Sequence, residues 1–469
     1  MGKTNKILIF NMKPKDVQSK IEQYLPVRED EKNKLGEVFT PITLIEEMLD
    51  HLPKTVWSNH EFKWLDPANG IGNFPMLTYQ RLMEGLKKWE PNKNKRSKHI
   101  IKNMLYMVEI NPKNVTISKQ IFGDDANICC ADFLNNDEKW QKQFGTNAFD
   151  IVIGNPPFQN GNSGKTAQGG HDLYPSFFIK SFELLNRNGM LLFITPTKWR
   201  APDKKGDLKI MWDLFINNNP IFLKIYGFSE TKQIFRGAAI TCLDYFLLQK
   251  NNNNDYTTVI DEENVKQQID LKEWSFLPNY NYDNIKKIIT TADKGIKIIY
   301  SSSQYDKRKH YMSETKHGQY KFPVMHSHTI KDGDIKYWSN TKEPIGNNFV
   351  HMFGIPKVIL IKGLYVYPYN DYKGEYAMSN YSFGIPITSK KQGDEIVNAI
   401  NTEQFNNIIK STKWSSRFTD HNMFKYFKPD FYKNFLKGDK LIRGQRRTKK
   451  LKKGGKKKTR KHNSNISIL

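Results

Sequence analysis

The stretch FDIVIGNPPF, residues 149–158, decides the fold and the site that this sequence predicts. Residues 149–153 are mostly apolar or β-branched and contain no helix or strand breaker, which is typical of a buried strand. Gly154 ends the strand, and the turn Asn155-Pro156-Pro157-Phe158 follows at its carboxyl end. Open α/β sheets bind ligands at the carboxyl ends of their strands, so this turn is the first candidate site.

The two prolines restrict the geometry of this turn. Each proline holds its own φ at about −65° and moves the residue before it out of the helical region. The Asn155 side-chain amide and the Pro156 carbonyl group can therefore point at one spot. Two acceptors at one spot suit an amino group conjugated to a ring, because hydrogen bonds from both its protons localise the nitrogen lone pair. Phe158 offers a face on which such a ring could stack. A tight Pro-Pro turn without chemistry is the alternative interpretation.

A second informative stretch is FKWLDPANGIGNFP, residues 62–75. It predicts the end of a strand, a turn over residues 66–72 and then a helix. Gly70 and Gly72 would let a ligand approach the backbone closely. The dinucleotide fingerprint G-x-G-x-x-G is not met, because Pro75 stands at its third glycine, and this argues against NAD. A simple tight turn is again the alternative.

Acidic residues follow three successive predicted strands before the Asn-Pro-Pro turn. Asp66 follows the strand just described, Glu109 ends the strand within 104–112, and Asp132 ends the strand within 128–134. Glu109 could hold the two hydroxyls of a ribose, and Asp132 could hold the amino group or ring edge of a purine. A single acid at a strand end is usually a solvated cap, but three in succession indicate a binding site.

Strand and helix patterns alternate over residues 60–250 and predict a doubly wound α/β sheet. Thr40 is expected to be the N-cap of a helix whose first residue is a proline. Residues 173–188 are expected to form one helix. The glycine-rich residues 159–172 do not meet the phosphate-loop pattern, and we expect a mobile active-site loop there.

The composition points to a polyanionic partner. The 469 residues carry a formal net charge of +25. Residues 443–461 contain twelve Lys or Arg and no acid, so the rest of the chain keeps a charge of about +13. A chain that keeps a positive net charge when its basic tail is left out is typical of a nucleic-acid-binding protein. The tail from residue 440 onward is expected to be disordered, and to bind DNA non-specifically or to direct nuclear import.

The three cysteines show neither metal-ligand spacing nor a disulfide framework, which favours a reducing compartment. No apolar run reaches about 18 residues, and the N-terminus lacks a signal-peptide pattern. We therefore expect a soluble intracellular protein that has no membrane partner. His326 and His328 have no cysteine or acidic cluster nearby in the sequence, so we expect no metal site.

The character of the sequence changes at the polar linker 251–254. Residues 256–435 are rich in Tyr, Asn, Lys and Trp and show no alternation of strands and helices. Aromatic residues interleaved with Lys and Arg suit contacts with bases and phosphates. A tyrosine-rich structural domain is the alternative.

Side by side, these stretches resemble the N6-adenine DNA methyltransferases, especially those of type II restriction-modification systems that have a C-terminal target-recognition domain. The resemblance covers roughly residues 34–200 and is carried by GEVFTP (36–41), DPANGIGNF (66–74), VEINP (108–112), ADF (131–133) and NPPF (155–158). The sequence departs from the family at Asn69, where a small residue such as Cys is common. This position mainly shapes the turn.

The resemblance implies a Rossmann-like methyltransferase domain over residues 35–250 that uses S-adenosyl-L-methionine and follows a lead-in over 1–34. A mixed α+β target-recognition domain would span residues 251–439, before the disordered basic tail 440–469. The implied partner is double-stranded DNA. An adenine would flip out of the duplex, and its N6 would attack the cofactor's methyl group in line, without a metal ion.

The same resemblance implies roles for individual residues. Those that would bind the methionine moiety, ribose and adenine of the cofactor are Phe39, Thr40, Asp66, Ala68, Gly70, Gly72, Glu109, Ile110, Asp132 and Phe133. Those that would hold the target amine and stack on the flipped base are Asn155, Pro156, Pro157 and Phe158.

Other functions stay open. Asn-Pro-Pro enzymes also methylate protein glutamine or bases in structured RNA, because a planar amide presents the same chemistry. A catalytically idle DNA-binding protein would need damaged motifs, and none is seen. A fused nuclease could use the D-x-K tripeptides at 270–272 and 334–336, but neither has a convincing upstream Pro-Asp. Any cognate restriction endonuclease is therefore expected to be a separate protein or to be absent.

Overall fold

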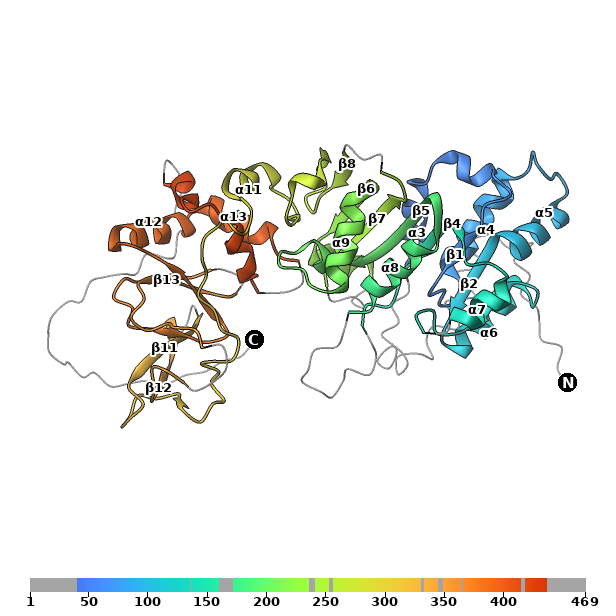
Figure 1. Ribbon diagram of the computed structural model, residues 1–469. Helices are drawn as coiled ribbons and strands as arrows, with labels where there is room; N and C mark the ends of the chain where they lie inside the picture. Colours follow the sequence, from blue (N-terminus) through green and yellow to red (C-terminus); the bar gives the residue numbers. More distant parts are fainter. Residues whose placement is uncertain are drawn as a thin grey trace, which may run out of the picture.

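The computed structural model describes residues 40–135, 137–159, 172–235, 241–252, 256–329, 333–344, 349–363, 366–414 and 418–436. The predictions for the lead-in, for Phe39, for nearly all of loop 159–172 and for the basic tail lie outside the described residues. Figure 1 shows a large sheet covered by helices and, beside it, a smaller C-terminal part coloured yellow to red. Among the described residues, no helix is both long enough and apolar enough to cross a membrane.

A nine-stranded sheet forms the centre of the larger part. Its strands are β1 (Trp64–Asp66), β2 (Leu105–Glu109), β3 (Asn127–Cys130), β4 (Phe149–Gly154), β5 (Leu185–Pro196), β6 (Asn219–Tyr226), β7 (Leu243–Gln249), β8 (Thr257–Ile260) and β9 (Lys266–Ile269). In space they follow the order β3-β2-β1-β4-β5-β7-β6-β8-β9. Strands β1 to β5 are parallel, and β7 lies antiparallel between β5 and β6. This order confirms the predicted doubly wound α/β sheet.

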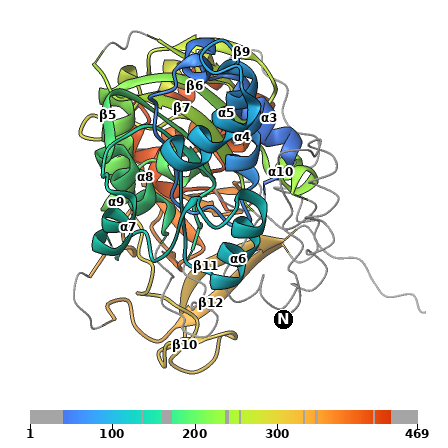
Figure 2. The same ribbon diagram turned by 90° about the vertical axis from the view of Figure 1, so that its right-hand side faces the viewer.

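Helices cover both faces of this sheet. On one face lie α3 (Ile42–Asp50), α4 (Asn73–Gly85) and α6 (Pro112–Phe122), and on the other α7 (Asp137–Phe144), α8 (Tyr174–Glu183) and α9 (Asp207–Asn217). Figure 2 shows this division, with α8 and α9 to the left of the sheet and α3 and α6 to its right. Strands β1 and β2 are buried along their whole length, because both faces are covered. Shorter elements are α5 (Lys93–His99), η4 (Ile100–Met104), η5 (Thr197–Arg200) and α10 (Phe228–Ile234).

One helix is shorter than predicted. The helix expected over 173–188 ends at Glu183, and β5 already begins at Leu185. A bulge interrupts the pairing of β5 with β4 before Met190. Within this bulge Asn188 has a φ of 65°, a left-handed conformation that Asn tolerates and that a helix excludes. The helical prediction was therefore wrong for the last part of this segment.

The C-terminal part mixes strands and helices. Its elements are η6 (Leu271–Glu273), α11 (Tyr282–Ile288), β10 (Met312–Ser313), β11 (Phe322–Thr329), β12 (Gly333–Ser339), β13 (Lys357–Ile361), β14 (Pro368–Asp371), β15 (Ala377–Met378), β16 (Ser382–Pro386), α12 (Lys390–Ile400), α13 (Glu403–Ser411), η7 (His421–Tyr426) and η8 (Phe431–Phe435). Two sheets form, in the orders β10-β12-β11-β15 and β14-β13-β16. Figures 1 and 2 both show β11 and β12 projecting below the large sheet.

The two parts share one of the hydrophobic clusters of the structure. A single cluster of buried side chains extends from Leu65 in β1 through Phe246 in β7 to Phe435 in η8. Strands β8 and β9 belong to the large sheet although they follow residue 250. The domain boundary predicted at residue 250 therefore lies between β7 and β8, which are strands of the same sheet.

Arg200 ties the large sheet to the C-terminal part through a buried ion pair. Arg200 and its partner Asp244 on β7 are both fully buried, with N–O distances of 2.7 and 2.9 Å. The guanidinium also donates to the carbonyl oxygens of Leu277 and Pro278 and to the side-chain oxygen of Asn279. These bonds use all five guanidinium N–H groups, so the buried charge is fully solvated by protein atoms.

The segment held by Arg200 is also fixed from the C-terminal side. The indole N–H of Trp414 donates to the Leu277 carbonyl oxygen at 2.8 Å. The backbone N–H of Asn279 donates to the Ser411 carbonyl oxygen at 2.6 Å. One short segment thus connects the end of β5, strand β7 and the end of α13.

Replacing Arg200 with Ala should lower the free energy of unfolding by about 3–5 kcal/mol, because Asp244 would stay buried without its counter-charge. Chemical denaturation measures this loss. The control Lys209→Ala removes an exposed ion pair with Asp213 on α9 and should cost under about 1 kcal/mol. Equal losses in the two variants would contradict the assigned role of Arg200. The double variant Arg200→Met, Asp244→Leu should recover part of the loss, since no charge is then buried.

Candidate functional site

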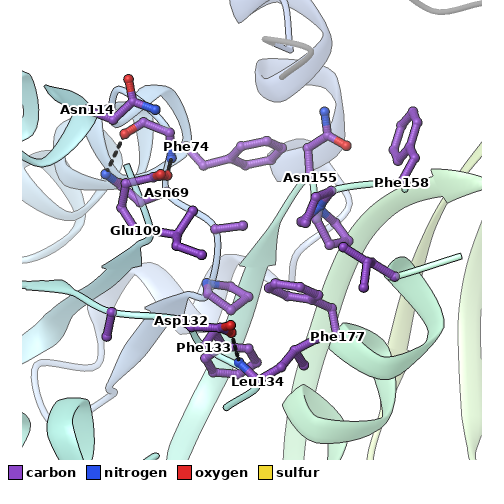
Figure 3. Close-up of a pocket in the computed structure, with 18 of the residues that line it drawn as sticks. Asn69, Phe74, Glu109, Asn114, Asp132, Phe133, Leu134, Asn155, Phe158 and Phe177 are labelled. Atoms are coloured by element: carbon purple, nitrogen blue, oxygen red, sulfur yellow. Dashed lines mark hydrogen bonds between the residues drawn. The ribbon is translucent and has the colours of Figure 1, made fainter. Parts of the chain in front are cut away.

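The carboxyl ends of β1 to β4 converge on one pocket (Figure 3). The strand order reverses between β1 and β4, where open α/β sheets bind ligands. The pocket has a volume of about 270 Å³. Its lining residues are Thr40, Pro67, Ala68, Asn69, Gly70, Ile71, Asn73, Phe74, Glu109, Ile110, Asn114, Ala131, Asp132, Phe133, Leu134, Asn135, Asn155, Pro156, Pro157, Phe158, Gln159, Leu173 and Phe177.

Most residues that the sequence predicted for the site line this pocket. They are Thr40, Ala68, Gly70, Glu109, Ile110, Asp132, Phe133, Asn155, Pro156, Pro157 and Phe158. Asp66 and Gly72 do not belong to the lining, and Phe39 is outside the described residues. The fold thus brings together side chains that lie more than a hundred positions apart in the sequence.

Glu109 braces the glycine turn from the end of β2. Its carboxylate accepts hydrogen bonds from the backbone N–H groups of Gly70 and Asn111, each at 2.7 Å. The residue is only 6% exposed. These two bonds fix the position of the carboxylate at the edge of the pocket.

Asp132 lies just past β3 and stabilises a turn. One carboxylate oxygen accepts from the backbone N–H groups of Leu134 and Asn135, and the other accepts from the Asn135 side-chain amide at 2.9 Å. The next residue, Phe133, is buried and stacks on Phe177 with ring centroids 5.4 Å apart. A carboxylate edge beside aromatic rings suits a planar heterocycle that carries an amino group.

Thr40 contacts Asn155 and does not cap α3. The helix begins at Ile42, its N-cap residue is Pro41, and no side chain caps it, so the N-cap prediction was wrong. Pro41 is extended, with a ψ of 143°, which delays the helix by one residue. The Thr40 hydroxyl instead accepts a hydrogen bond from the Asn155 side-chain nitrogen at 3.1 Å. In Figure 3 the amide oxygen of Asn155 points toward Phe158.

Aromatic rings lie on both sides of the Asn155 amide (Figure 3). Phe74, from the first turn of α4, is buried, whereas Phe158 is half-buried and lines the pocket. A planar group held at the Asn155 amide therefore has an aromatic face within reach.

Asp66 lies beneath the pocket, where it supports the turn. Burial raises the pKa of Asp66 to about 8, and the charge of Glu109 adds to this rise. The hydrogen bond that the Ala68 backbone N–H donates at 3.1 Å opposes it. Its carboxyl group packs against the end of β4, since a Cβ at Gly154 would lie 3.0 Å from the Asp66 Oδ1 atom. Gly72 has a φ of 96° and is the N-cap of α4, so it shapes the backbone.

Three contributors to the site were missed or undervalued in the sequence. Phe74 closes the motif 66–74 but was given no role of its own, and no signal in the sequence separates Phe177 from a core position. Asn69 donates to the Ser118 hydroxyl of α6 at 2.7 Å and to the Gly70 carbonyl oxygen at 3.1 Å. It thus anchors the glycine turn to a neighbouring helix. The sequence signal for this role was the amide side chain of Asn69, which stands where the family often has a small residue.

Replacing Asp66 with Asn should change how stability depends on pH. A carboxyl whose pKa is raised on folding keeps its proton in the folded state at a pH where it has lost it in the unfolded state. Its contribution to the free energy of unfolding therefore decreases as the pH rises from about 4 to about 8. An amide has no such dependence. Between pH 5 and pH 8 the free energy of unfolding of the variant should therefore rise by up to about 4 kcal/mol relative to that of the unsubstituted protein.

Urea denaturation of both proteins at several pH values measures this difference. The carboxamide has nearly the same shape and can still accept from the Ala68 N–H, so the fold should be retained. If the two stability curves run parallel between pH 5 and pH 8, Asp66 does not hold its proton in the folded state.

Known proteins match this chain in sequence. Residues 89–235 match the model of the Eco57I restriction-modification methylase family. A protein of Mycoplasma pneumoniae named as an uncharacterized adenine-specific methylase is 27% identical over 288 residues, which cover 46% of this chain and 67% of that protein. The resemblance to adenine-specific methyltransferases of restriction-modification systems is thereby confirmed.

Solved structures match over both parts of the chain. A nuclease-deletion mutant of the Type ISP restriction-modification enzyme LlaGI, solved with a DNA substrate mimic, has a TM-score of 0.54 and 14% identity and matches 87% of this chain. The DrdV–DNA complex has a TM-score of 0.50 and 12% identity and matches 90% of this chain. The matches cover 47% and 59% of those chains, less than two thirds of either. They show a shared fold.

Proposed function

We propose that this chain is a site-specific DNA adenine N6-methyltransferase that uses S-adenosyl-L-methionine. The observation that carries the proposal is the meeting of Asn155, Glu109 and Asp132 in one pocket at the strand ends. We assign methyl transfer to the part that contains the nine-stranded sheet. Because that sheet extends to Ile269, we place the start of the target-recognition part after β9.

The donors and acceptors of the pocket fit the proposed cofactor. Glu109 would accept from the two ribose hydroxyls, and Ile110, which is 60% exposed, would cover the ribose from the solvent side. Asp132 and Phe133 would hold the adenine ring, and the turn around Gly70 would surround the methionine moiety. When bound, the cofactor supplies an activated methyl group.

The Asn-Pro-Pro turn would hold the target amine. The Asn155 amide oxygen and the Pro156 carbonyl oxygen would each accept one proton of the adenine N6 group, which directs the nitrogen lone pair out of the ring plane. Phe158 would stack on the flipped base. Because Thr40 holds the Asn155 amide nitrogen, the amide oxygen is oriented before the base arrives. Such preorganised acceptors lower the barrier without a general base.

We assign any restriction activity to a separate cognate endonuclease. Asp270, which begins one of the two D-x-K tripeptides, accepts from the backbone N–H of Lys272 at 2.9 Å and is the N-cap of η6. The Asp270 carboxylate is thus already used in a local cap. Across the described ranges, no three His, Cys, Asp or Glu side chains are grouped so that they could hold a metal ion.

Expression of the protein should place N6-methyladenine in one short DNA motif of the host, and Asn155→Ala should abolish it, because the variant lacks one of the two acceptors for the amine. Single-molecule sequencing of host DNA measures both. Unmodified DNA from cells that contain soluble, cofactor-binding protein would contradict the proposal. Structured RNA or protein glutamine would then be tested as the substrate.

Replacing Thr40 with Val should lower kcat by up to about 10²-fold, because the Asn155 amide would lose the bond that orients its oxygen. Thr40→Ser is the matched control, since it keeps the hydroxyl and should retain most activity. Methyl transfer to a duplex that contains the recognised motif gives kcat and KM for each variant. Equal activity of the Val and Ser variants would show that the hydroxyl does not position Asn155.

A further inference from the structure

A row of aromatic and basic side chains connects the mouth of the candidate site with the C-terminal part. We call this row the aromatic–basic stripe and define it by Lys198, Lys205, Phe418, Tyr381, His326 and Arg308. Lys198, Lys205 and Phe418 line one groove, and ring contacts connect Phe418 with Tyr381 and Tyr381 with His326.

The stripe begins at the mouth of the pocket. Lys198 in η5 forms an ion pair with Asp172 at 2.8 Å, and its side chain is 54% exposed. Asp172 forms an antiparallel β-bridge with Gln159, which lines the pocket beside Phe158. A polyanion that passes Lys198 would therefore run directly past the place where a flipped base would enter.

A groove then leads from the large sheet to the C-terminal part. It has a volume of about 330 Å³. Its lining residues are Lys198, Ala201, Pro202, Asp203, Lys204, Lys205 and Leu208 on one side and Thr412, Trp414, Phe418, Asp420 and Asn422 on the other. Lys205 is exposed on its first side. Two acids line this groove, and one of them, Asp203, forms an ion pair with Lys425 at 2.8 Å.

Two exposed aromatic rings touch each other at the far side of the groove. Phe418 is 51% exposed and Tyr381 is 40% exposed, and their ring centroids lie 5.8 Å apart in an edge-to-face contact. Tyr381 also contacts the His326 ring of β11 at 4.9 Å. The His326 Nδ1 atom lies 2.8 Å from the Ser379 hydroxyl, so this ring is held in place. Adjoining exposed rings are typical of a contact surface.

The stripe ends in a basic turn. The Arg308 guanidinium forms two hydrogen bonds with Asp306, at 2.9 and 2.7 Å, and its side chain is 82% exposed. The Asp306 carboxylate and, more weakly, the Tyr381 phenol raise the pKa of the Arg308 guanidinium, so Tyr381 lies in its neighbourhood. Exposed lysines, Lys307 and Lys309, flank it in the chain. A fixed and exposed guanidinium between two lysines suits the phosphate groups of a nucleic acid.

We infer that the duplex beside the flipped adenine lies along the aromatic–basic stripe, with Lys198, Lys205 and Arg308 on phosphates and with Phe418 and Tyr381 against bases or sugars. This inference rests on the proposed function and names the residues by which the chain would hold its DNA. Cations would supply most of the affinity, and the two fixed rings would contact the nucleotides between them.

The test uses the full chain and a labelled duplex of mixed sequence, with binding measured over a series of salt concentrations. The double variant Phe418→Ala, Tyr381→Ala should bind about tenfold more weakly with an unchanged salt slope, because it loses the burial of two aromatic rings against the duplex and no charge. Lys205→Ala and Arg308→Ala should each lower the slope of log K against log salt by about one, because each loses one phosphate contact.

Matched controls lie away from the stripe. Tyr256→Ala removes a tyrosine that is 64% exposed just before β8, and Lys93→Ala removes an exposed lysine of α5, at the opposite end of the molecule in Figure 1. Both should leave affinity and salt slope unchanged. Thermal unfolding of each variant shows whether a loss of binding comes from a loss of folding.

The outcomes separate this inference from the proposed function. Adenine methylation by the unsubstituted protein, together with stripe variants that bind DNA like the controls, would overturn the stripe alone. Absence of adenine methylation in DNA would overturn the proposed function, whatever the binding results. Unlabelled RNA and unlabelled DNA can each be added to compete with the labelled duplex. If RNA displaces the duplex more strongly than DNA does, the assignment of DNA as the occupant of the stripe is overturned.

Discussion

The buried pair of Arg200 and Asp244 is the interaction on which the rest of the structure depends. A charge removed from water is tolerated only where its hydrogen-bonding groups find partners, and here every guanidinium N–H has one. The acceptors lie on β7 and on residues 277–279, so one side chain joins the large sheet to the C-terminal part. The candidate site and the aromatic–basic stripe therefore belong to one packed body.

The candidate site is held in shape by its own side chains. Glu109 braces the glycine turn, Asp132 stabilises the turn that follows β3, and Thr40 fixes the amide of Asn155. Both carboxylates are hydrogen-bonded to the protein, which fixes their positions. A site arranged in this way needs little reorganisation when its ligand binds. Such preorganisation is the main source of catalysis where no strong acid or base takes part.

Much of the larger part was predictable from local patterns. The buried strands, the turn at Asn155 and the acids at strand ends follow from residue types within a few positions, and parallel strands bring such ends together. Helix 173–188 was predicted too long because the bulge at Asn188 depends on pairing with β4. Thr40 was assigned to a cap because its contact with Asn155 links residues that are 115 positions apart. The roles assigned to the site residues stay predictions.

The sequence by itself determined the α/β sheet, the motif order and the family resemblance, because hydrophobic periodicity and short motifs are local properties of the chain. Only the tertiary structure decided that β8 and β9 complete the large sheet and that one hydrophobic cluster includes residues of both parts. It also decided which aromatic residues of the C-terminal part are buried and which, like Phe418 and Tyr381, are exposed. The physical reason is that burial and hydrogen-bond partners depend on contacts between distant segments, which no local pattern encodes.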